Sequence, residues 1–159
     1  MKLSNAIETT YSNQVHNPLI TKGIISVSSN VELTKQEIES VNTALKLIHA
    51  ASERGYDLPS SRHAHVFFIG QDSITIELEE NVCGIYAPII VYPVNKWREK
   101  KMGQDDIVVI LLEEMCHFLW EIQDEYEVKQ RVLSLVRIAI PEMTLERLYR
   151  RFSVPAPKQ

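Results

Sequence analysis

The chain has 159 residues, 45% of them hydrophobic and 24% charged, a composition typical of one globular domain around one core. Its two cysteines, Cys83 and Cys116, lack a paired metal-ligand spacing, and no apolar run is long enough to cross a membrane or to form a signal peptide. These features exclude a disulfide scaffold, a thiolate zinc finger and a membrane protein. They predict a single soluble domain over residues 1–159 in a reducing, cytoplasmic compartment.

The net charge of −4 is unevenly distributed along the chain. Residues 1–101 sum to −1, residues 102–128 hold eight acidic residues and no lysine or arginine, and residues 129–159 hold seven basic and two acidic residues. The overall acidity argues against a nucleic-acid partner. Because half of the acidic segment falls in an apolar stretch, its carboxylates need a cation nearby, which either a metal ion or an arginine of the C-terminal end can supply.

The N-terminal third predicts one firm element. Residues 1–32 are weakly patterned, with one or two short strands expected at residues 19–20 and 23–27. Thr34 and Glu37 have the spacing of a capping box, apolar residues then recur at helical intervals, and Gly55 is suited to a left-handed stop. The sequence therefore predicts an amphipathic helix over residues 35–54.

The middle of the chain has the alternation of β-strands. Residues 63–69 and 74–78 alternate apolar and polar side chains on either side of a Gly-Gln-Asp turn, which predicts an antiparallel hairpin. Residues 85–94 are strand-like but contain two prolines, which favours an edge strand. A polar linker is expected over residues 95–104.

The C-terminal part predicts three helices. The first begins near Asp105 or Asp106 and is apolar on nearly every side from residue 107 to 112, so it should lie in the core. The second runs over residues 124–140 and ends at Pro141, and a short basic helix over residues 144–152 precedes a tail at residues 153–159. The expected fold is α+β: an N-terminal helix, a small antiparallel sheet with an edge strand, a buried helix and further C-terminal helices.

The buried helix carries the string Glu113-Glu114-x-x-His117. Positions i and i+4 share one helix face, so Glu113 and His117 can converge on one atom while Glu114 points aside. This resembles the H-E-x-x-H motif, in which two histidines bind zinc and the glutamate between them is the general base. Glu113 replaces the first histidine. A third ligand has to come from the acidic residues that follow, which are Glu121, Asp124, Glu125 and Glu127.

Around this string the chain resembles the zincin-like metallopeptidases, and among them the ImmA/IrrE-type family. Glu125-Tyr126-Glu127-Val128 occupies the place of that family's E-x-E-A segment, and residues 138–141 the place of its closing apolar-Pro segment. The resemblance implies a zincin-like fold, Glu113, His117 and Glu125 as metal ligands, Glu114 as general base, and cleavage of a peptide or protein that adds to the edge strand. Zinc is the first expected metal. Manganese or iron comes next, because two carboxylates make the site harder than two imidazoles do.

Other interpretations of these residues stay open. Glu113 and His117 can form a plain ion pair, and the later acids can be a solvated helix start. The whole chain can be a zincin-type fold that lost its metal and serves as an interaction module. A ferritin-like di-metal protein needs a second E-x-x-H and four long helices, and the predicted strands argue against it.

Three further features have a structural and a functional interpretation. His63-x-His65 puts two imidazoles on one strand face, a spacing seen in metal sites but more common at polar strand ends. Cys116 is expected to be an inert packing residue, as are Trp97 and Trp120. The basic run at residues 147–151 is expected to be a solvated helix face.

Overall fold

The computed structural model describes the chain except for residues 1, 4–16, 57–62, 71–75, 78–87 and 151–159. Its elements, in chain order, are β1 (Lys2–Leu3), α1 (Pro18–Thr21), β2 (Ile25–Ser29), α2 (Lys35–Glu53), β3 (Ala64–Ile69), β4 (Ile76–Glu77), β5 (Ile89–Pro93), α3 (Val94–Glu99), α4 (Gln104–Leu119), α5 (Glu125–Val136) and α6 (Leu145–Tyr149). The fold class is α+β, as predicted.

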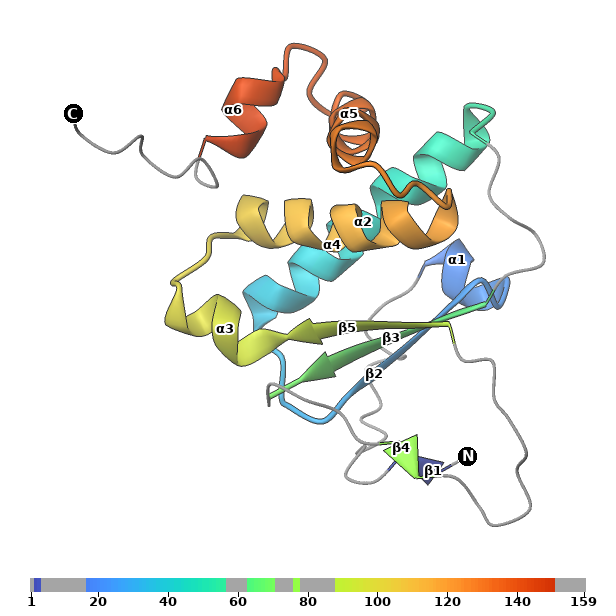
Figure 1. Cartoon of the computed structure of the whole chain (residues 1–159), viewed down its shortest axis with the longest axis vertical. Helices are drawn as coiled ribbons and strands as arrows, with labels where there is room; N and C mark the ends of the chain where they lie inside the picture. The colour runs from blue at the N-terminus through green and yellow to red at the C-terminus, as the bar shows by residue number, and fades with distance from the viewer. Residues whose placement is uncertain (1, 4–16, 57–62, 71–75, 78–87, 151–159) are drawn as a thin grey trace.

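The elements form layers (Figure 1). Strands β2, β3 and β5 make one sheet, and helices α2 and α4 cross one of its faces. Helices α5 and α6 lie beyond α4, on the side away from the sheet. Helix α4 is therefore enclosed by the sheet on one side and by the C-terminal helices on the other.

The sheet is parallel, so the predicted antiparallel hairpin is wrong. Strand β3 is central and pairs in parallel with β2 and with β5. The segment expected to pair with β3 forms β4 instead, which pairs antiparallel with β1. The 19-residue helix α2 connects β2 to β3, and a helical crossover of that length brings the second strand back in the same direction as the first.

The burial of β3 fits a parallel sheet. Val66, Phe67 and Phe68 are consecutive and all buried, so both faces of the central strand are covered. Parallel strands with two covered faces have near-continuous apolar sequences instead of strict alternation. Strand β5 has the edge position that its prolines predict, since β3 is its single pairing partner among the described residues.

Helix α2 confirms the prediction for residues 35–54. The Thr34 hydroxyl accepts from the Glu37 backbone N–H at 3.3 Å, and the Glu37 carboxylate accepts from the Thr34 N–H at 2.7 Å. Gly55 follows the helix with φ +90°, a conformation that favours glycine. The local sequence signals of this helix therefore decide both of its ends.

The later helices differ from the prediction in extent. Residues 95–99, expected as part of a linker, and Val94, expected at the end of a strand, form α3, whose Trp97 is 4% exposed and packs in the core. Helix α5 ends at Val136, four residues before the predicted end at Ile140, and turns connect Val136 to Pro141. Helix α6 is confined to Leu145–Tyr149, with Thr144 as its N-cap.

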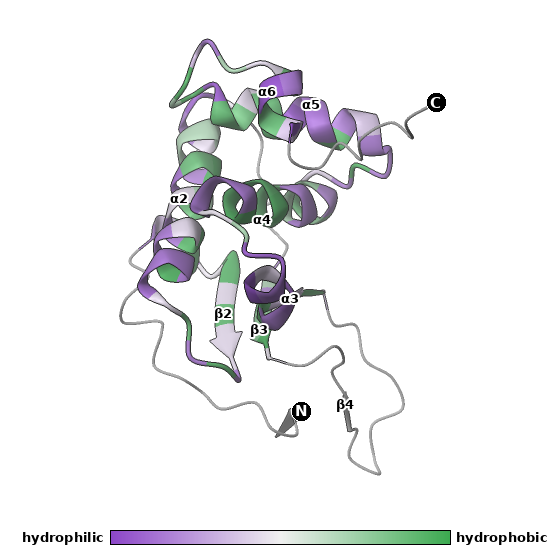
Figure 2. Cartoon of the chain, turned by 90° about the vertical axis from the view of Figure 1, so that its left-hand side faces the viewer, coloured by the Kyte–Doolittle hydropathy of each residue, from purple (hydrophilic) through white to green (hydrophobic). Residues whose placement is uncertain are grey.

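The core lies between the sheet and helices α2, α4 and α5. Helix α4 is the most apolar helix and is drawn largely in green in the middle of Figure 2, whereas α3, α5 and α6 show more purple. Leu111, Leu112 and Met115 of α4 are fully buried. Among the described residues, no helix combines the length and apolarity needed to span a bilayer.

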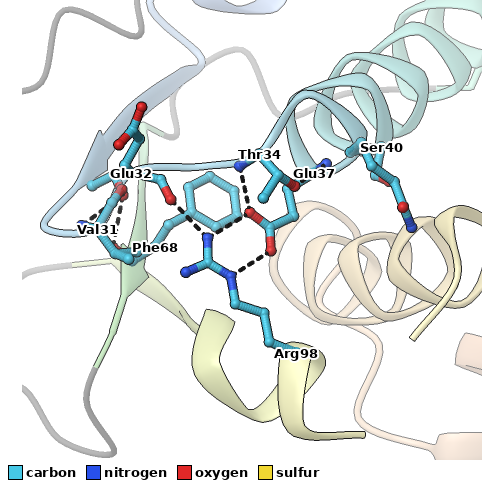
Figure 3. Close-up of polar contacts among 9 residues, drawn as sticks. Val31, Glu32, Thr34, Glu37, Ser40, Phe68 and Arg98 are labelled. Carbon is cyan, nitrogen blue, oxygen red and sulfur yellow. Dashed lines mark hydrogen bonds and ion pairs between the residues drawn. The ribbon is translucent and has the colours of Figure 1, made fainter. Parts of the chain in front are cut away.

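An ion pair between the buried Glu37 and the partly exposed Arg98 joins α3 to the start of α2 (Figure 3). The Arg98 guanidinium donates from Nε and from one Nη to the two Glu37 carboxylate oxygens, both at 2.9 Å. It also donates to the Glu32 carbonyl at 2.7 Å. Burial acts to raise the pKa of Glu37, but Arg98 and Thr34 hold the pKa below its ordinary value of 4.5.

Several predicted features lie outside the described residues. They are the turns at residues 70–72 (apart from Gly70) and 81–84, Cys83, the first part of the predicted edge strand, the start of the chain before residue 17 (apart from β1), the end of the basic run and the tail at residues 153–159.

Candidate functional site

The candidate site lies between α4 and α5. Helix α4 carries Glu113, Glu114 and His117 in its last two turns, and Glu125 is the first residue of α5. The two helices are joined by a short turn in which Glu121 has a left-handed backbone, φ +54°. A non-glycine residue in this conformation is strained by about 1–3 kcal/mol. This turn returns the chain so that α5 begins beside His117.

His117 is held in one orientation. Its Nδ1 lies 2.6 Å from the Ile122 carbonyl oxygen, which only accepts hydrogen bonds, so Nδ1 carries the proton. Nε2 faces Glu125, with Nε2 to Oε1 at 3.6 Å, and the Glu125 side chain is exposed. In the neutral imidazole, Nε2 is thus left with a lone pair directed toward a carboxylate.

Glu113 is half-buried and lies near α5 and α6. Burial raises its pKa above the ordinary value, and the carboxylates of Glu125 and Glu114 act in the same direction. The hydroxyl of Tyr149 of α6 and the charge of Lys129 of α5 oppose that rise. Burial also raises the pKa of Tyr149, and Glu113 adds to this. The nearby positive charge therefore comes from a lysine of α5, and the C-terminal helix contributes a tyrosine in place of the expected arginine.

Glu114 lies on a different side of α4 from Glu113, as the sequence predicts. Its side chain is exposed. Burial raises the pKa of Tyr92 well above its ordinary value, and the charge of Glu114 contributes to this shift. Tyr92 belongs to β5 and donates to the Leu111 carbonyl at 2.9 Å, which joins β5 to α4. Glu114 is therefore close enough to β5 for its charge to affect Tyr92.

The remaining candidates for a third ligand have local roles. The Asp124 carboxylate caps α5 by accepting from the Glu127 N–H at 2.9 Å. Glu127 is in the first turn of α5, where an acidic residue favours the helix dipole. Glu121 forms the left-handed turn, and all three side chains are exposed.

The structure brings together two of the predicted ligands and places the third in the same neighbourhood. His117 and Glu125 face each other, and Glu113 senses the charge of Glu125 but is engaged with Tyr149. Within the described part of the chain, no group of three His, Cys, Asp or Glu side chains has the geometry to hold a metal ion. His117 and Glu125 are thus arranged as a pair, and Glu113 is not positioned with them as a third donor.

Three partners of the site escaped sequence reasoning. Ile122 acts through its carbonyl, which no sequence pattern reveals, and Lys129 and Tyr149 lie in the basic C-terminal segment, where no motif distinguishes them. Lys129 lies four residues after Glu125, a helical spacing that places both on one face of α5, so its proximity was open to inference.

The aromatic and thiol residues behave as predicted. Cys116 is fully buried, and burial raises the pKa of its thiol to about 12, so the thiolate is disfavoured. Trp97 is in the core, and Trp120 is partly buried and packs against the core. The Arg131 guanidinium lies 5.1 Å from the Trp120 ring centroid. Both tryptophans are packing residues.

No protein-family model, curated protein or solved structure matches the chain. The site therefore has to be interpreted from its own chemistry.

Proposed function

We propose that the chain is a zincin-like domain with a divalent-metal site, in which His117 and Glu125 bind the metal, Glu113 completes the ligand set and Glu114 is the general base. The expected activity is metal-assisted hydrolysis of a peptide bond. The observation that carries this proposal is the orientation of His117, fixed at Nδ1 by the Ile122 carbonyl and open at Nε2 toward Glu125.

The ring nitrogen of a metal-binding histidine that does not bind the metal usually donates its N–H to a carbonyl or carboxylate, as Nδ1 of His117 does to the Ile122 carbonyl. Two ligands of a tetrahedral zinc ion, each about 2.1 Å from the metal, lie about 3.4 Å apart. The 3.6 Å between His117 Nε2 and Glu125 Oε1 is close to this span. One imidazole and one carboxylate at this spacing are therefore compatible with a divalent cation. The left-handed backbone at Glu121, between the two ligands in sequence, agrees with a functional site, because strained residues cluster at such sites.

A bound divalent cation supplies Lewis acidity toward a carbonyl oxygen. Glu114 is placed to take a proton from the attacking water, since it is exposed and next to the metal-binding face. Its charge affects Tyr92 of β5, and the edge of this strand is where an extended peptide would add. Because this ligand set has two carboxylates, manganese or iron competes with zinc more strongly than in a site with two imidazoles.

A specific observation favours a second candidate, a metal-free interaction module of the same fold. Glu113 already has Tyr149 and Lys129 as partners, so its charge is partly compensated by the protein itself. In this alternative the His117 to Glu125 contact is a surface ion pair, which contributes about 0–1 kcal/mol.

Metal content of the purified full chain, measured by mass spectrometry, separates the two. The proposal predicts that His117→Ala and Glu125→Ala each bind one equivalent of divalent metal less than the wild type, and that Glu113→Ala binds that equivalent more weakly. Glu127→Ala is the matched control for Glu125, because it removes an exposed carboxylate two residues further along the same helix turn. It should keep the metal.

Activity is tested separately with peptide substrates. Glu114→Gln should keep the metal and abolish hydrolysis, because the amide cannot take up the proton. A wild-type chain that folds normally and binds no zinc, manganese or iron under titration would refute the metal site and leave the interaction module. Full activity in Glu114→Gln would remove this residue from the role of base.

A further inference from the structure

A second cluster of donor groups lies on the sheet, away from α4. Ser26 of β2 and His65 of β3 are direct neighbours in the parallel register, and His63 precedes β3 by one residue. Alternation along the strands puts Ile25, Ala64 and Val66 into the core under the helices. Ser26, His63 and His65 therefore share the opposite face of the sheet, and all three are half-buried.

Two imidazole nitrogens point at one oxygen atom in this cluster. His63 Nε2 lies 3.1 Å from Ser26 Oγ, and His65 Nδ1 lies 2.8 Å from the same atom. The two rings are edge to face, with centroids 4.4 Å apart. His63 Nδ1 is 2.6 Å from the Gly23 carbonyl oxygen, so Nδ1 carries a proton and Nε2 of the neutral ring has a lone pair toward Ser26.

The serine hydroxyl has one proton and cannot donate to both rings. When it donates to His63, His65 has to donate its own Nδ1 proton to the hydroxyl oxygen. A cation placed among the three groups accepts the lone pairs of both imidazoles and of the oxygen at once, and the His65 proton then resides on Nε2. The Gly23 carbonyl already orients His63 as an outer partner orients a metal-bound histidine.

We propose that Ser26, His63 and His65 form a binding site for a divalent transition-metal ion of the zinc and copper class, distinct from the site at His117. Two neutral imidazoles with one hydroxyl oxygen suit zinc, nickel or copper and do not suit magnesium or calcium, which prefer oxygen ligands only. Water completes the coordination. Copper should bind more tightly than zinc, because Cu²⁺ exceeds Zn²⁺ in the general order of affinities of divalent transition metals for nitrogen and oxygen ligands.

The test is a titration of the full chain with Zn²⁺, Cu²⁺ or Mg²⁺. Isothermal calorimetry measures the binding, and NMR monitors the histidine ring nitrogens during the titration. In a His117→Ala background, which removes the other candidate site, one equivalent of Zn²⁺ should bind, and the ring signals of His63 and His65 should shift. Mg²⁺ should not bind at this site.

Substitutions assign the ligands. His63→Ala and His65→Ala should each weaken Zn²⁺ binding by at least about tenfold, since even outer partners of a metal site change affinity by about 10- to 100-fold. His49→Ala is the matched control, because His49 is half-buried but lies on α2 beside Glu53. It should leave the affinity unchanged. Unfolding in EDTA verifies that each variant folds, and His63→Gln and His65→Gln replace any alanine variant that does not.

Two results would overturn the proposal. One is Zn²⁺ and Cu²⁺ binding of unchanged affinity when both His63 and His65 are replaced. The other is the absence of binding by the folded His117→Ala chain. Because His117 is removed in this background, failure here leaves the proposed function of the His117 site intact, and loss of metal at His117 leaves this site intact.

Discussion

Two glutamates on core helices, Glu37 and Glu113, receive opposite treatment from their surroundings. Glu37 is 4% exposed and accepts two hydrogen bonds from Arg98 and one from the Thr34 N–H, and its pKa is lowered despite burial. Glu113 has Tyr149 and Lys129 nearby, yet burial and two neighbouring carboxylates raise its pKa. The fold stabilises the charge of Glu37 and leaves that of Glu113 only partly compensated.

This difference separates a structural carboxylate from a functional candidate. A carboxylate that accepts three hydrogen bonds, two of them from a guanidinium, gains little from a further cation or proton, whereas an undercompensated one binds either favourably. The same sequence pattern, an acidic residue in an amphipathic helix, produces both. What decides is the element packed against the helix: α3 with Arg98, or α5 and α6 with Lys129 and Tyr149.

The largest expected effect comes from breaking the paired carboxylate. Arg98→Ala leaves Glu37 buried without its cation, and we expect the free energy of unfolding to fall by about 2–3 kcal/mol, below the 3–5 for a wholly buried pair because Arg98 is partly exposed. Chemical denaturation measures it. Lys35→Ala is the control, since the exposed Lys35 to Glu39 pair at 3.8 Å should change stability by less than about 0.5 kcal/mol. Equal effects in the two variants would contradict the structural role of Arg98.

The next effect is the acid sensitivity of the same pair. The folded-state pKa of Glu37 is below its ordinary value of 4.5, so the ionised pair contributes stability above about pH 4.5 and loses it as the pH falls through the folded pKa. Glu37→Gln cannot titrate. Its unfolding free energy should therefore decrease less between pH 7 and pH 3 than that of the parent, by about 1.5–2 kcal/mol, the low end of the range for a hydrogen bond to a charged group. Parallel pH profiles for the two proteins would rule out this contribution.

Glu113 should respond with the opposite sign. Its folded-state pKa is raised, so the protonated form contributes stability at low pH, which is lost as the pH rises through the folded pKa. In EDTA at pH 7, Glu113→Gln should therefore increase the unfolding free energy slightly, by less than about 1 kcal/mol. With zinc, the proposed site predicts a reversal: the parent gains stability from the metal and the variant gains less. Destabilisation in EDTA would mean that Lys129 and Tyr149 compensate the charge fully.

Local signals predicted α2, α4 and α5, but the segment of α1 was predicted as a strand at residues 19–20 and most of α3 as a linker. The parallel strand pairing was missed because it depends on segments distant in sequence. Thr34, Glu37 and Gly55 define α2 through contacts within a few residues, so the sequence alone was sufficient. Strand β3 was assigned a hairpin partner because the next alternating segment is close in sequence. Its partners are β2 and β5, and the covering helix α2 is what makes the first pairing parallel.

In the candidate site, too, the residues that are close in sequence were predicted, and the groups that come from distant elements or from the backbone were missed. Glu113, Glu114 and His117 follow from helical spacing, and Glu125 follows from a resemblance in the next helix. Tyr149 comes from α6, more than thirty residues away, and the Ile122 carbonyl is a backbone group. Ser26 joins His63 and His65 only because β2 and β3 pair in a register that the sequence does not reveal.

The smallest expected effect tests how far Tyr149 restrains Glu113. Tyr149→Phe removes the hydroxyl that lowers the pKa of Glu113 and keeps the ring against the core, so the pKa of Glu113 should rise further while stability changes little. Carbon-13 NMR of the glutamate carboxyls in EDTA follows this titration, and Glu146, in the first turn of α6, is the internal control that should not shift. If the phenol is what holds Glu113 away from His117, the same variant should also bind zinc more tightly, because a freed carboxylate reaches the metal without first separating from the hydroxyl. An unchanged Glu113 titration would show that Lys129 alone sets the charge of this residue, and the contrast with Glu37 would then rest on one lysine.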